Sequence, residues 1–325
     1  MINKQMYNKL NTKQNRRLLL KLYKSANTPA KMLALVLLVA AALVIMLLPN
    51  SRQLTGDFEA AFLDVGQGDS ILICADDRTV LIDAGGLHGD PTVMAEQVVI
   101  PYIKSLGIEK LDLVVNTHPD NDHIGGLFAV LDDLQVDTLA MFDGYEDSRK
   151  QQQLLSLAEY ENINVRSVAA GDVLEFSDNF KIEVLAPEYG DIFDDDHVNN
   201  GSLVLHISYQ DFDMLTTGDL QGWEQDSAIR GLDCTDIEVL QLPHHGSKNS
   251  YDEDWYAEFN PEAVIISCGI DNDYGHPGKN VVKYWQQEQV DIYRTDYHGS
   301  CRVIYKDGVL SFETAETAET AENAA

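Results

Sequence analysis

Short apolar or alternating runs, separated by turn signals, open the folded part of the chain. The runs FEAAFLDV, SILICA and TVLIDA lie between residues 58 and 84, with GQGD and DDR between them. Such spacing is typical of consecutive β-strands joined by tight turns. We therefore expect a β-meander at the start of the domain.

Strand-like and helical segments then alternate. Apolar runs predict strands at LDLVVNT, INVRSVAAGDVLEF, FKIEVLAP, SLVLHISYQDFDMLTTGD, IEVLQLP and AVIISCG, and near residues 291 and 302. The fourth of these contains a hairpin turn at Gln210 to Asp213. Helices are predicted over 92–106, with an interruption at Pro101, and over 148–160, 222–231, 250–259 and 279–288. Sheets covered by helices on their outer faces are the natural packing for this order.

A continuous apolar run precedes this pattern. The stretch MLALVLLVAAALVIMLL, residues 32–48, is uncharged and as an α-helix just reaches the length that crosses a bilayer. We interpret it as one uncleaved membrane span. A cleaved signal peptide is the alternative, but the run is long for that role and PNSRQL after it offers no small-x-small cleavage site. A buried core helix would show a polar face, which this run lacks.

Basic residues precede the apolar run in the sequence, and acidic residues follow it. Residues 1–31 carry eight lysines and arginines and no acid, whereas all 53 acidic residues lie beyond position 56. Basic segments stay on the cytoplasmic side of a membrane, so we expect a single-pass cell-membrane protein with a cytoplasmic N-terminus and an extracytoplasmic domain. The predicted parts are a basic cytoplasmic tail (1–31), a transmembrane helix (32–48), a linker (49–56), the folded domain (57–312) and a low-complexity tail (313–325).

The folded part is strongly acidic. From residue 57 on, 14 basic and 53 acidic residues give a formal charge of −39, against −30 for the whole chain. Binding of nucleic acid depends on Lys and Arg at phosphates, so this composition makes a poor surface for a polyanion. We interpret most of the acids as a solvated shell that keeps the domain soluble.

Four cysteines, Cys74, Cys234, Cys268 and Cys301, show no C-x-x-C spacing. Their spacing therefore gives no zinc-finger or redox signature. Oxidising surroundings would permit a disulfide such as Cys268–Cys301, and small buried thiols are the equal alternative.

The residues with metal-binding chemistry gather where the strand LDLVV ends. The sequence NTHPDNDHIGG brings His118, Asp120, Asp122 and His123 together. Alternation along an extended chain puts the first three on one side, and His123 follows as the Gly-Gly turn begins. A divalent cation would satisfy such a group. The alternative is an Asp-rich turn in which Asp122 caps a helix at Ile124.

Two further strand ends carry side chains of the same kind. LTTGDL ends one strand with Asp219, and LQLPHHGS ends another with His244 and His245. A lone Asp before a helix is usually a cap and a lone His is usually structural, but three such strand ends in succession favour a metal centre. Histidines mixed with carboxylates suit Zn²⁺ or Mn²⁺, and two cations bridged by one aspartate would stabilise the transition state of a hydrolysis.

The order of these motifs resembles a known family. FLDVGQGDS, LIDAGG, THPDNDHIGG, NNGSLVL, LTTGD, LPHHGS and YGHP follow one another as in the metallo-β-lactamase superfamily, and DVGQGDS with HHGS is similar to its ComEC-type branch. The resemblance covers about residues 57–312. It implies an α/β fold, namely an αβ/βα four-layer sandwich behind the N-terminal transmembrane helix. It also implies two divalent metal ions, Zn or Mn, at the edge between the two sheets, and no organic cofactor.

The resemblance further implies how the ligands divide. The first metal would be bound by His118 and Asp120, the second by Asp122, His123 and His245, with His244 as the rival of His245, and both metals by Asp219.

The sequence departs from the common family pattern at two places. Asp120 stands where the motif H-x-H-x-D-H has its second histidine, a feature that the ComEC branch shares. The remaining first-metal histidine has no match, because HVNNGSLVL places Asn199 and Asn200 in that region and His197 slightly too early. The missing histidine leaves the first metal position with one ligand fewer, which bears on its occupancy.

Other polar residues near strand ends have candidate roles. Asp83 in LIDAGG would orient a ligand histidine, although Asp83 and Asp64 would look the same as plain turn formers. Asp122 and His276 are the candidate catalytic residues, and His276 in DYGHPG would act as general acid, hold a substrate phosphate, or merely order the Pro-Gly turn. Candidate phosphate contacts are Ser70, Ser202, Ser247 and Lys248.

We therefore expect an anchored extracytoplasmic metal-dependent hydrolase in which the cations activate water. By resemblance its substrate is a phosphoester, either a phosphodiester in nucleic acid or an envelope phosphocholine ester. A catalytically inactive surface binding module is the alternative from a different class, motivated by the incomplete first ligand set and the acidity. Hydrolysis of β-lactams is a weaker alternative, because the ComEC-type motifs point elsewhere.

Overall fold

The computed structural model describes residues 54–86, 89–145, 148–193, 197–222 and 236–315. The chain separates into two compact units, Met1–Ser51 and Arg52–Ala325, and every described residue belongs to the second. The predicted cytoplasmic tail (1–31) and membrane span (32–48) lie outside the described residues, as do nearly all of the predicted helix 222–231 and most of the tail from 313. Within the described ranges, no helix has both the length and the apolar character needed to cross a bilayer.

The opening meander is confirmed and forms the middle of the first sheet. The strand order of this sheet is β15-β14-β1-β2-β3-β4-β5-β6, with the parallel pairs β3–β4, β4–β5 and β5–β6 on one side. Its strands are β1 (Phe58–Phe62), β2 (Ile71–Ala75), β3 (Arg78–Ile82), β4 (Lys110–Asn116), β5 (Gln135–Met141), β6 (Asn164–Ser167), β14 (Cys301–Lys306) and β15 (Val309–Thr314).

The second sheet combines an antiparallel half with a parallel half. Its order is β13-β12-β11-β10-β9-β8-β7, in which β10 to β13 run parallel. The predicted hairpin joins β9 to β10, with Gln210 at φ 54° in the turn. The strands are β7 (Val173–Glu175), β8 (Phe180–Ala186), β9 (Val204–Tyr209), β10 (Phe212–Thr216), β11 (Val239–Gln241), β12 (Ala263–Ile266) and β13 (Asp291–Arg294).

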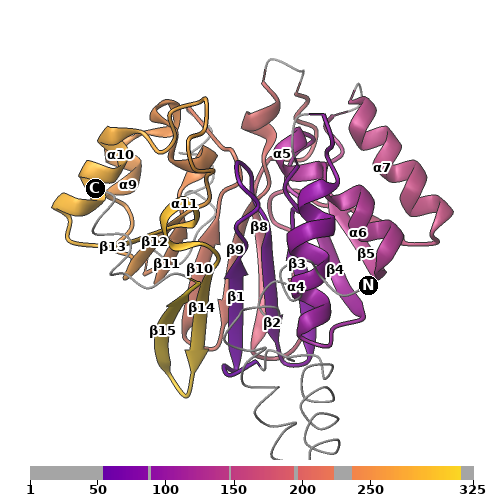
Figure 1. Ribbon diagram of the computed structural model, residues 1–325, viewed down its shortest axis with the longest axis horizontal. Helices are drawn as coiled ribbons and strands as arrows, with labels where there is room; N and C mark the ends of the chain where they lie inside the picture. The colour runs from indigo at the N-terminus through magenta and orange to yellow at the C-terminus, as the bar shows by residue number, and fades with distance from the viewer. Residues whose placement is uncertain (1–53, 87–88, 146–147, 194–196, 223–235, 316–325) are drawn as a thin grey trace, which may run out of the picture. The chain divides into compact units, whose positions relative to one another are not determined.

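Three buried apolar clusters hold four layers together. The central cluster lies between the two sheets and includes Phe58, Phe62, Phe180 and Phe212, all fully buried. A second cluster packs η1 (Ala95–Val99), α4 (Ile100–Ser105), α6 (Leu127–Asp133) and α7 (Arg149–Tyr160) on the first sheet. A third packs α9 (Glu253–Tyr256) and α10 (Lys279–Gln287) on the second sheet. Helices therefore cover the outer face of each sheet, as the αβ/βα sandwich requires (Figure 1).

Local signals explain where the predicted helices differ from the observed ones. The interruption at Pro101 is present, since the chain passes from the π-helical η1 to α4 at this point with the proline in the first turn of α4. The predicted helix 250–259 is shorter, because the Asp252 side chain caps α9 by accepting a hydrogen bond from Trp255 N at 3.1 Å.

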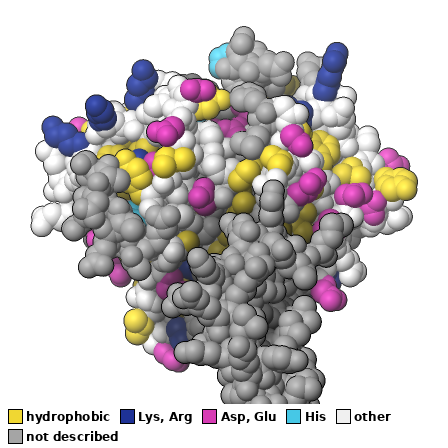
Figure 2. All heavy atoms as spheres, in the orientation of Figure 1, with side chains coloured by type: hydrophobic (Ala, Val, Ile, Leu, Met, Phe, Trp, Pro, Cys, Tyr) yellow, Lys and Arg dark blue, Asp and Glu magenta, His cyan; other side chains and the backbone are white. Residues whose placement is uncertain are grey.

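The structure also tests the predictions about the cysteines and the acidic surface. Cys74, Cys268 and Cys301 are buried free thiols, so the Cys268–Cys301 disulfide is not formed. Acidic side chains are dispersed over the face shown in Figure 2 and do not form one patch, which agrees with a solvated acidic shell.

Two glycines let the loops after β1 and β3 pack against the loop 118–123. A Cβ added to Gly68 would lie 2.3 Å from Asp122 O, and one added to Gly86 would lie 2.0 Å from Asn121 O. Only a residue without a side chain permits such an approach of backbone to backbone. The motifs DVGQGD and LIDAGG thus hold the short helix α5 (Asn121–Ile124) in place.

Replacing Gly86 with alanine should therefore displace the loop 118–123. We expect the free energy of unfolding to fall by about 1–3 kcal/mol because of the forced contact, and hydrolysis to fall by about 10²-fold because the ligands shift by about an ångström. Thermal melts and steady-state kinetics measure the two effects. Gly171→Ala is the control, because φ +90° strains it while no atom lies within 4 Å of the added Cβ. Unchanged activity in Gly86→Ala would contradict this account of the loop.

Candidate metal centre

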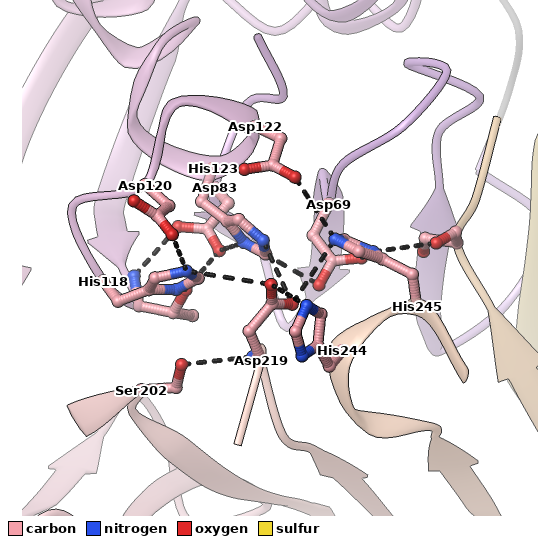
Figure 3. Close-up of polar contacts among 12 residues, drawn as sticks. Asp69, Asp83, His118, Asp120, Asp122, His123, Ser202, Asp219, His244 and His245 are labelled. Carbon is pink, nitrogen blue, oxygen red and sulfur yellow. Dashed lines mark hydrogen bonds and ion pairs between the residues drawn. The ribbon is translucent and has the colours of Figure 1, made fainter. Parts of the chain in front are cut away.

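The candidate ligands come from the carboxyl ends of strands in both sheets. The loop after β4 carries His118 to His123, the turn after β10 carries Asp219, and η3 (Pro243–Gly246) after β11 carries two histidines. Carboxyl ends of parallel strands meet at one edge of a sheet and commonly form binding sites in α/β folds. Figure 3 shows the resulting cluster, with four imidazoles around the Asp219 carboxylate.

Four imidazole Nε2 atoms approach the buried carboxylate of Asp219. The distances to Asp219 Oδ1 are 3.2 Å from His123 and 3.4 Å from His245. The distances to Asp219 Oδ2 are 3.6 Å from His244 and 3.9 Å from His118. Each carboxylate oxygen therefore faces a different pair of histidines.

The Nδ1 atom of every one of these imidazoles is held by another partner. Asp83 Oδ2 lies 2.8 Å from Nδ1 of His123, and Ser267 O lies 2.9 Å from Nδ1 of His245. Contacts of the same kind engage Nδ1 of His118 (Thr117 Oγ1, 3.1 Å) and of His244 (Gln221 Oε1, 3.1 Å). Metal-binding histidines are typically fixed in this way, with one ring nitrogen bonded and the other aimed at the metal.

The converging atoms make no hydrogen bonds among themselves. Nε2 of His118, His123 and His245 and Oδ1 of Asp219 are buried without a hydrogen-bond partner, although His123 Nε2 lies 3.2 Å from Asp219 Oδ1. Leaving such groups unsatisfied in the interior is costly. Nitrogen and carboxylate oxygen are ligands of divalent transition metals, so the residues present fit a metal ion.

Two carboxylates of the loop after β4 lie on opposite sides of the Asp219 carboxylate. Asp122 Oδ2 lies 3.5 Å from His245 Nε2, on the Oδ1 side of Asp219. Asp120 Oδ2 lies 4.0 Å from His118 Nε2, on the Oδ2 side. The alternative of an Asp122 cap is wrong, because α5 begins at Asn121 and its N-cap, Asp120, makes no side-chain capping bond.

The two adjacent histidines after β11 are separated by backbone geometry. His244 (φ 52°, ψ 48°) and His245 (φ 56°, ψ 28°) both adopt the left-handed conformation, which is rare for residues other than glycine. His244 N donates to Gly218 O at 2.9 Å, which pins this turn to the loop that carries Asp219. Strained backbone at a site of this kind is a recurrent feature of functional centres. The turn sends His245 to one oxygen of Asp219 and His244 to the other.

Asp83 is a fully buried organiser of the cluster. Besides His123, its carboxylate accepts hydrogen bonds from Thr117 N at 2.9 Å and Thr117 Oγ1 at 2.5 Å. The predicted orienting contact from Asp83 to a ligand histidine is thus present. Asp64, by contrast, accepts from Gly66 N at 3.2 Å and closes a turn.

One member of the cluster was missed in the sequence. Asp69, in DVGQGDS, is buried, and its oxygens lie 3.8 Å from Nδ1 of His123 and 3.8 Å from Nδ1 of His245. A ligand atom from each of Asp69, His123, Asp219 and His245 lies within 4.8 Å of the others. Gln241 Nε2 donates to Asp69 Oδ2 at 2.6 Å. Asp69 thus approaches the Nδ1 side of both rings, whose Nδ1 atoms are bonded to Asp83 and to Ser267 O.

Burial and charge move the pKa values of the cluster in opposite directions. Burial, reinforced by His123, lowers the pKa of His118 to about 3. Burial also disfavours charge on His245, but the Asp219 carboxylate and the contact with Asp122 outweigh it and raise its pKa to about 9. The same balance raises the pKa of His123. Burial acts to raise the pKa of Asp219, but His245 and His123 outweigh it and hold this pKa well below its usual range. The carboxylates thus favour positive charge next to Asp219.

Metal affinity should consequently depend on pH. A ligand imidazole must be neutral, so loading the metal must displace at least the proton of His245. Below its pKa of about 9, the apparent affinity should rise by about tenfold or more per pH unit. Titration calorimetry between pH 6 and 8 in buffers of different ionisation enthalpy measures the proton release. An affinity independent of pH over this range would contradict the assignment of His245 as a ligand.

A cavity of about 390 Å³ opens directly onto the cluster. Its lining includes Asp120, Asp122, Asp219, His244 and His245 together with Gln67, Gly86, Asn121, Lys150, Asn199, Tyr274 and His276.

The predicted phosphate contacts lie elsewhere. Ser202 Oγ accepts from Asp219 N at 3.1 Å and Ser247 Oγ accepts from Asn249 N at 3.1 Å, so both hydroxyls support the turns. Ser70 is buried and Lys248 is exposed, and neither lines the cavity. Lys150, on the first turn of α7, is the one lysine or arginine among the described residues that line it. Sequence reasoning missed Lys150 because it lies far along the chain from every motif.

His276 lines the cavity as a neutral donor. Burial, followed by His245 and His244, lowers the pKa of His276 to about 4. Gly269 N donates to Gln67 Oε1 at 3.3 Å, which leaves Gln67 Nε2 to donate to His276 Nδ1 at 3.3 Å. The proton of the neutral ring is therefore on Nε2. This arrangement favours hydrogen bonding to a substrate oxygen over the predicted role of general acid.

The region of the unmatched first-metal histidine contains amides. Asn199 lines the cavity, and the buried Oδ1 atoms of Asn199 and Asn200 have no hydrogen-bond partner. His197 is exposed and does not line the cavity. The side of Asp219 that faces His118 and Asp120 receives its second imidazole from His244 instead.

Comparisons with known proteins point to one group. The model of the Metallo-beta-lactamase superfamily matches residues 63–141. ComE operon protein 3 of Bacillus subtilis (strain 168) is 32% identical over 271 residues, which cover 80% of this chain and 34% of that protein. Competence protein ComA of Neisseria gonorrhoeae is 27% identical over 239 residues, covering 73% of this chain and 31% of the relative. The chain spans about a third of the length of these curated relatives.

Solved structures were also compared with the chain, and the similarity is low. A metallo hydrolase from the hyperthermophilic archaeon Ignicoccus hospitalis superposes with a TM-score of 0.47 and 13% identity, covering 79% of this chain and all of the other.

Proposed function

Because the chain belongs to the metallo-β-lactamase superfamily, in the branch of the ComEC-family competence proteins, we propose that it is a metal-dependent phosphodiesterase. The observation that carries the proposal is the convergence of four imidazole Nε2 atoms on the two oxygens of Asp219. Divalent cations held there would supply an activated water and neutralise charge on a phosphoryl oxygen. Metal identity and number belong to the proposal.

Other residues of the chain would orient the candidate ligands and bind the substrate. Asp83 and the Ser267 carbonyl fix the rings of His123 and His245, so that the ligand atoms are preorganised. His276 presents its Nε2–H to a substrate oxygen from the rim of the cavity. Lys150 lies near Asp120, whose carboxylate it influences electrostatically, and offers an ammonium group to a phosphate oxygen.

The charge of the domain bears on the length of the substrate. From residue 57 on, the sequence carries a formal charge of −39. This acidity disfavours binding of a long polyanion, which points to short segments or chain ends as substrates.

Replacing Lys150 with alanine should mainly weaken substrate binding. Loss of one charge-assisted contact to phosphate is expected to raise KM by about tenfold with little change in kcat. Steady-state kinetics on bis-p-nitrophenyl phosphate give both constants. Arg149→Ala is the matched control, because this neighbour is exposed and does not line the cavity. Equal effects of the two substitutions would contradict the role of Lys150.

The proposed function is tested by combining metal analysis with a substrate screen. The purified full chain is analysed for bound metals and assayed with bis-p-nitrophenyl phosphate, short DNA and RNA, a phosphocholine ester and nitrocefin. We expect bound Zn or Mn and hydrolysis of phosphodiesters, with no turnover of nitrocefin. Turnover of the phosphocholine ester alone would favour an envelope esterase.

A binding module without activity is the second candidate. It is favoured by the amides Asn199 and Asn200 in the region where the common family pattern has a histidine. In that case the full chain would contain no metal or would hydrolyse no phosphoester after reconstitution with Mn²⁺ or Zn²⁺.

We also propose that residues 32–48 anchor the chain in the cell membrane with the domain outside the cytoplasm. The proposal rests on the uncharged run and on the eight basic residues that precede it. Protease added to intact spheroplasts should digest the domain and leave a cytoplasmic N-terminal tag protected. A domain that resists protease until the cells are lysed would overturn this orientation.

A further inference from the structure

The loop between β12 and α10 forms one rim of the cavity and is held rigidly by its own hydrogen bonds. Asn272 Nδ2 donates to Gly269 O at 2.8 Å and to His276 O at 2.7 Å. Asn272 Oδ1 accepts from His276 N at 2.9 Å. One side chain thus joins the two ends of the loop, and the residues between them have a fixed position.

Gln67 ties this loop to the first sheet. Its Oε1 accepts from Gly269 N and its Nε2 donates to His276 Nδ1, both at 3.3 Å. A Cβ on Gly269 would lie 2.8 Å from Gln67 N, so the two backbones pack closely. The loop is therefore clamped on the same DVGQGD segment that supports the candidate ligands.

Tyr274 is the aromatic residue that this loop presents. Its ring is stacked on the imidazole of His276, with an interplanar angle of 26° and 5.7 Å between centroids. The side chain lines the cavity and is nevertheless 59% exposed. Single exposed apolar residues are common. The ring of Tyr274 differs, because it is stacked on a second ring and its loop is fixed by hydrogen bonds beside the candidate ligands. It therefore forms a preformed contact surface.

We infer that Tyr274 is a specificity-determining residue that stacks on a planar heteroaromatic ring, a nucleobase, carried by one substituent of the phosphodiester. This inference rests on the proposed phosphodiesterase function. Every nucleobase has a π-face, so one tyrosine backed by His276 is sufficient to accept it. Lys150, which also lines the cavity, is available for the phosphate.

The same geometry disfavours a choline substituent. Quaternary ammonium groups are held by cages of several aromatic faces. Among the described residues that line the cavity there is one tyrosine and no tryptophan or phenylalanine, and a lysine is present. A planar neutral ring is therefore the better occupant of the Tyr274 surface.

The test uses two substrates that differ only in their bases. Hydrolysis of the dinucleoside phosphate TpT by the metal-loaded full chain is compared with that of its analogue in which hydrogen replaces both thymines. Wild type should favour TpT in kcat/KM by about tenfold or more, the range of one base–aromatic stack. Tyr274→Ala should lose this preference, because KM should rise much more for TpT than for the abasic substrate. Tyr274→Phe should keep most of it.

The control and a second readout keep the outcomes distinct. Tyr160→Ala removes a tyrosine that is 80% exposed on α7 outside the cavity and should keep the preference. Equilibrium binding of thymidine 5′-phosphate and of the abasic sugar phosphate is measured on the same variants. Loss of hydrolysis with a retained binding preference that depends on Tyr274 would reject only the phosphodiesterase function. Equal handling of both ligands by wild type, or an equal loss for both in Tyr274→Ala, would overturn the inference.

Discussion

Replacing Asp219 with asparagine should lower kcat/KM for bis-p-nitrophenyl phosphate by about 10³-fold, the effect of losing about 4 kcal/mol of charge stabilisation in the transition state. Asp219 faces His123 and His245 with one oxygen and His118 and His244 with the other. Asparagine keeps the size of the side chain but provides a single oxygen and no charge. The bound metal, measured by elemental analysis, should fall with the activity.

The fold should survive this substitution. Asp219 N, which donates to Ser202 Oγ, is unaffected, and the strand β10 that precedes the loop lies in the core. Circular dichroism should therefore match that of wild type. Asp211→Asn, an exposed change in the hairpin turn, serves as the matched control and should leave activity intact. Activity of Asp219→Asn within threefold of the control, with metal still bound, would contradict a bridging role.

The substitution Asp83→Asn should have the largest effect on stability. The fully buried Asp83 carboxylate accepts from Thr117 N and Thr117 Oγ1 and faces His123 Nδ1. An amide turns an NH₂ group toward these donors, which should lower the free energy of unfolding by about 3 kcal/mol. For a domain of this size that corresponds to a fall in Tm of roughly 6–12 °C. Metal affinity should fall by about 10–100-fold because His123 loses its orienting partner.

Asn is chosen because Asp83 has φ 54°, a conformation that asparagine tolerates better than alanine. Asp77→Asn is the control, since Asp77 has φ 59° but lies in the exposed turn between β2 and β3. Differential scanning calorimetry and titration of Mn²⁺ measure the two effects. If the Tm of Asp83→Asn equals that of Asp77→Asn, Asp83 does not organise the cluster.

Much of the sheet structure follows from local pattern. The runs at β1, β2 and β3 are short and bounded by GQGD and DDR, so their type and ends are fixed by neighbouring residues. The hairpin at Gln210 is likewise local. By contrast, α9 is shorter than its apolar pattern predicts, because the cap at Asp252 sets its start.

The candidate ligands were predicted by residue type, but their arrangement depends on tertiary structure. The sequence shows that His244 and His245 are adjacent, which suggested a choice between them for one position. Two successive left-handed residues turn the imidazoles apart, and this backbone geometry has no sequence signal other than the following glycine. The roles of the individual residues as metal ligands stay predictions.

Asp69, Lys150 and Gln67 were missed for a related reason. Asp69 stands in a motif that reads as a turn, and its contacts with two histidine rings arise only when the sheets pack. Gln67 lies 202 residues from Gly269, to which it is hydrogen-bonded. Long-range contacts between polar residues in loops leave no periodic pattern in the sequence.

We propose that Asp219 stands between two cation positions. Anomalous scattering from crystals of the Mn²⁺-loaded full chain tests it directly. The account predicts two peaks, each about 2 Å from one Asp219 oxygen, one shared with His123 and His245 and the other with His118 and His244. Metal-loaded crystals without a peak within coordination distance of Asp219 would contradict it.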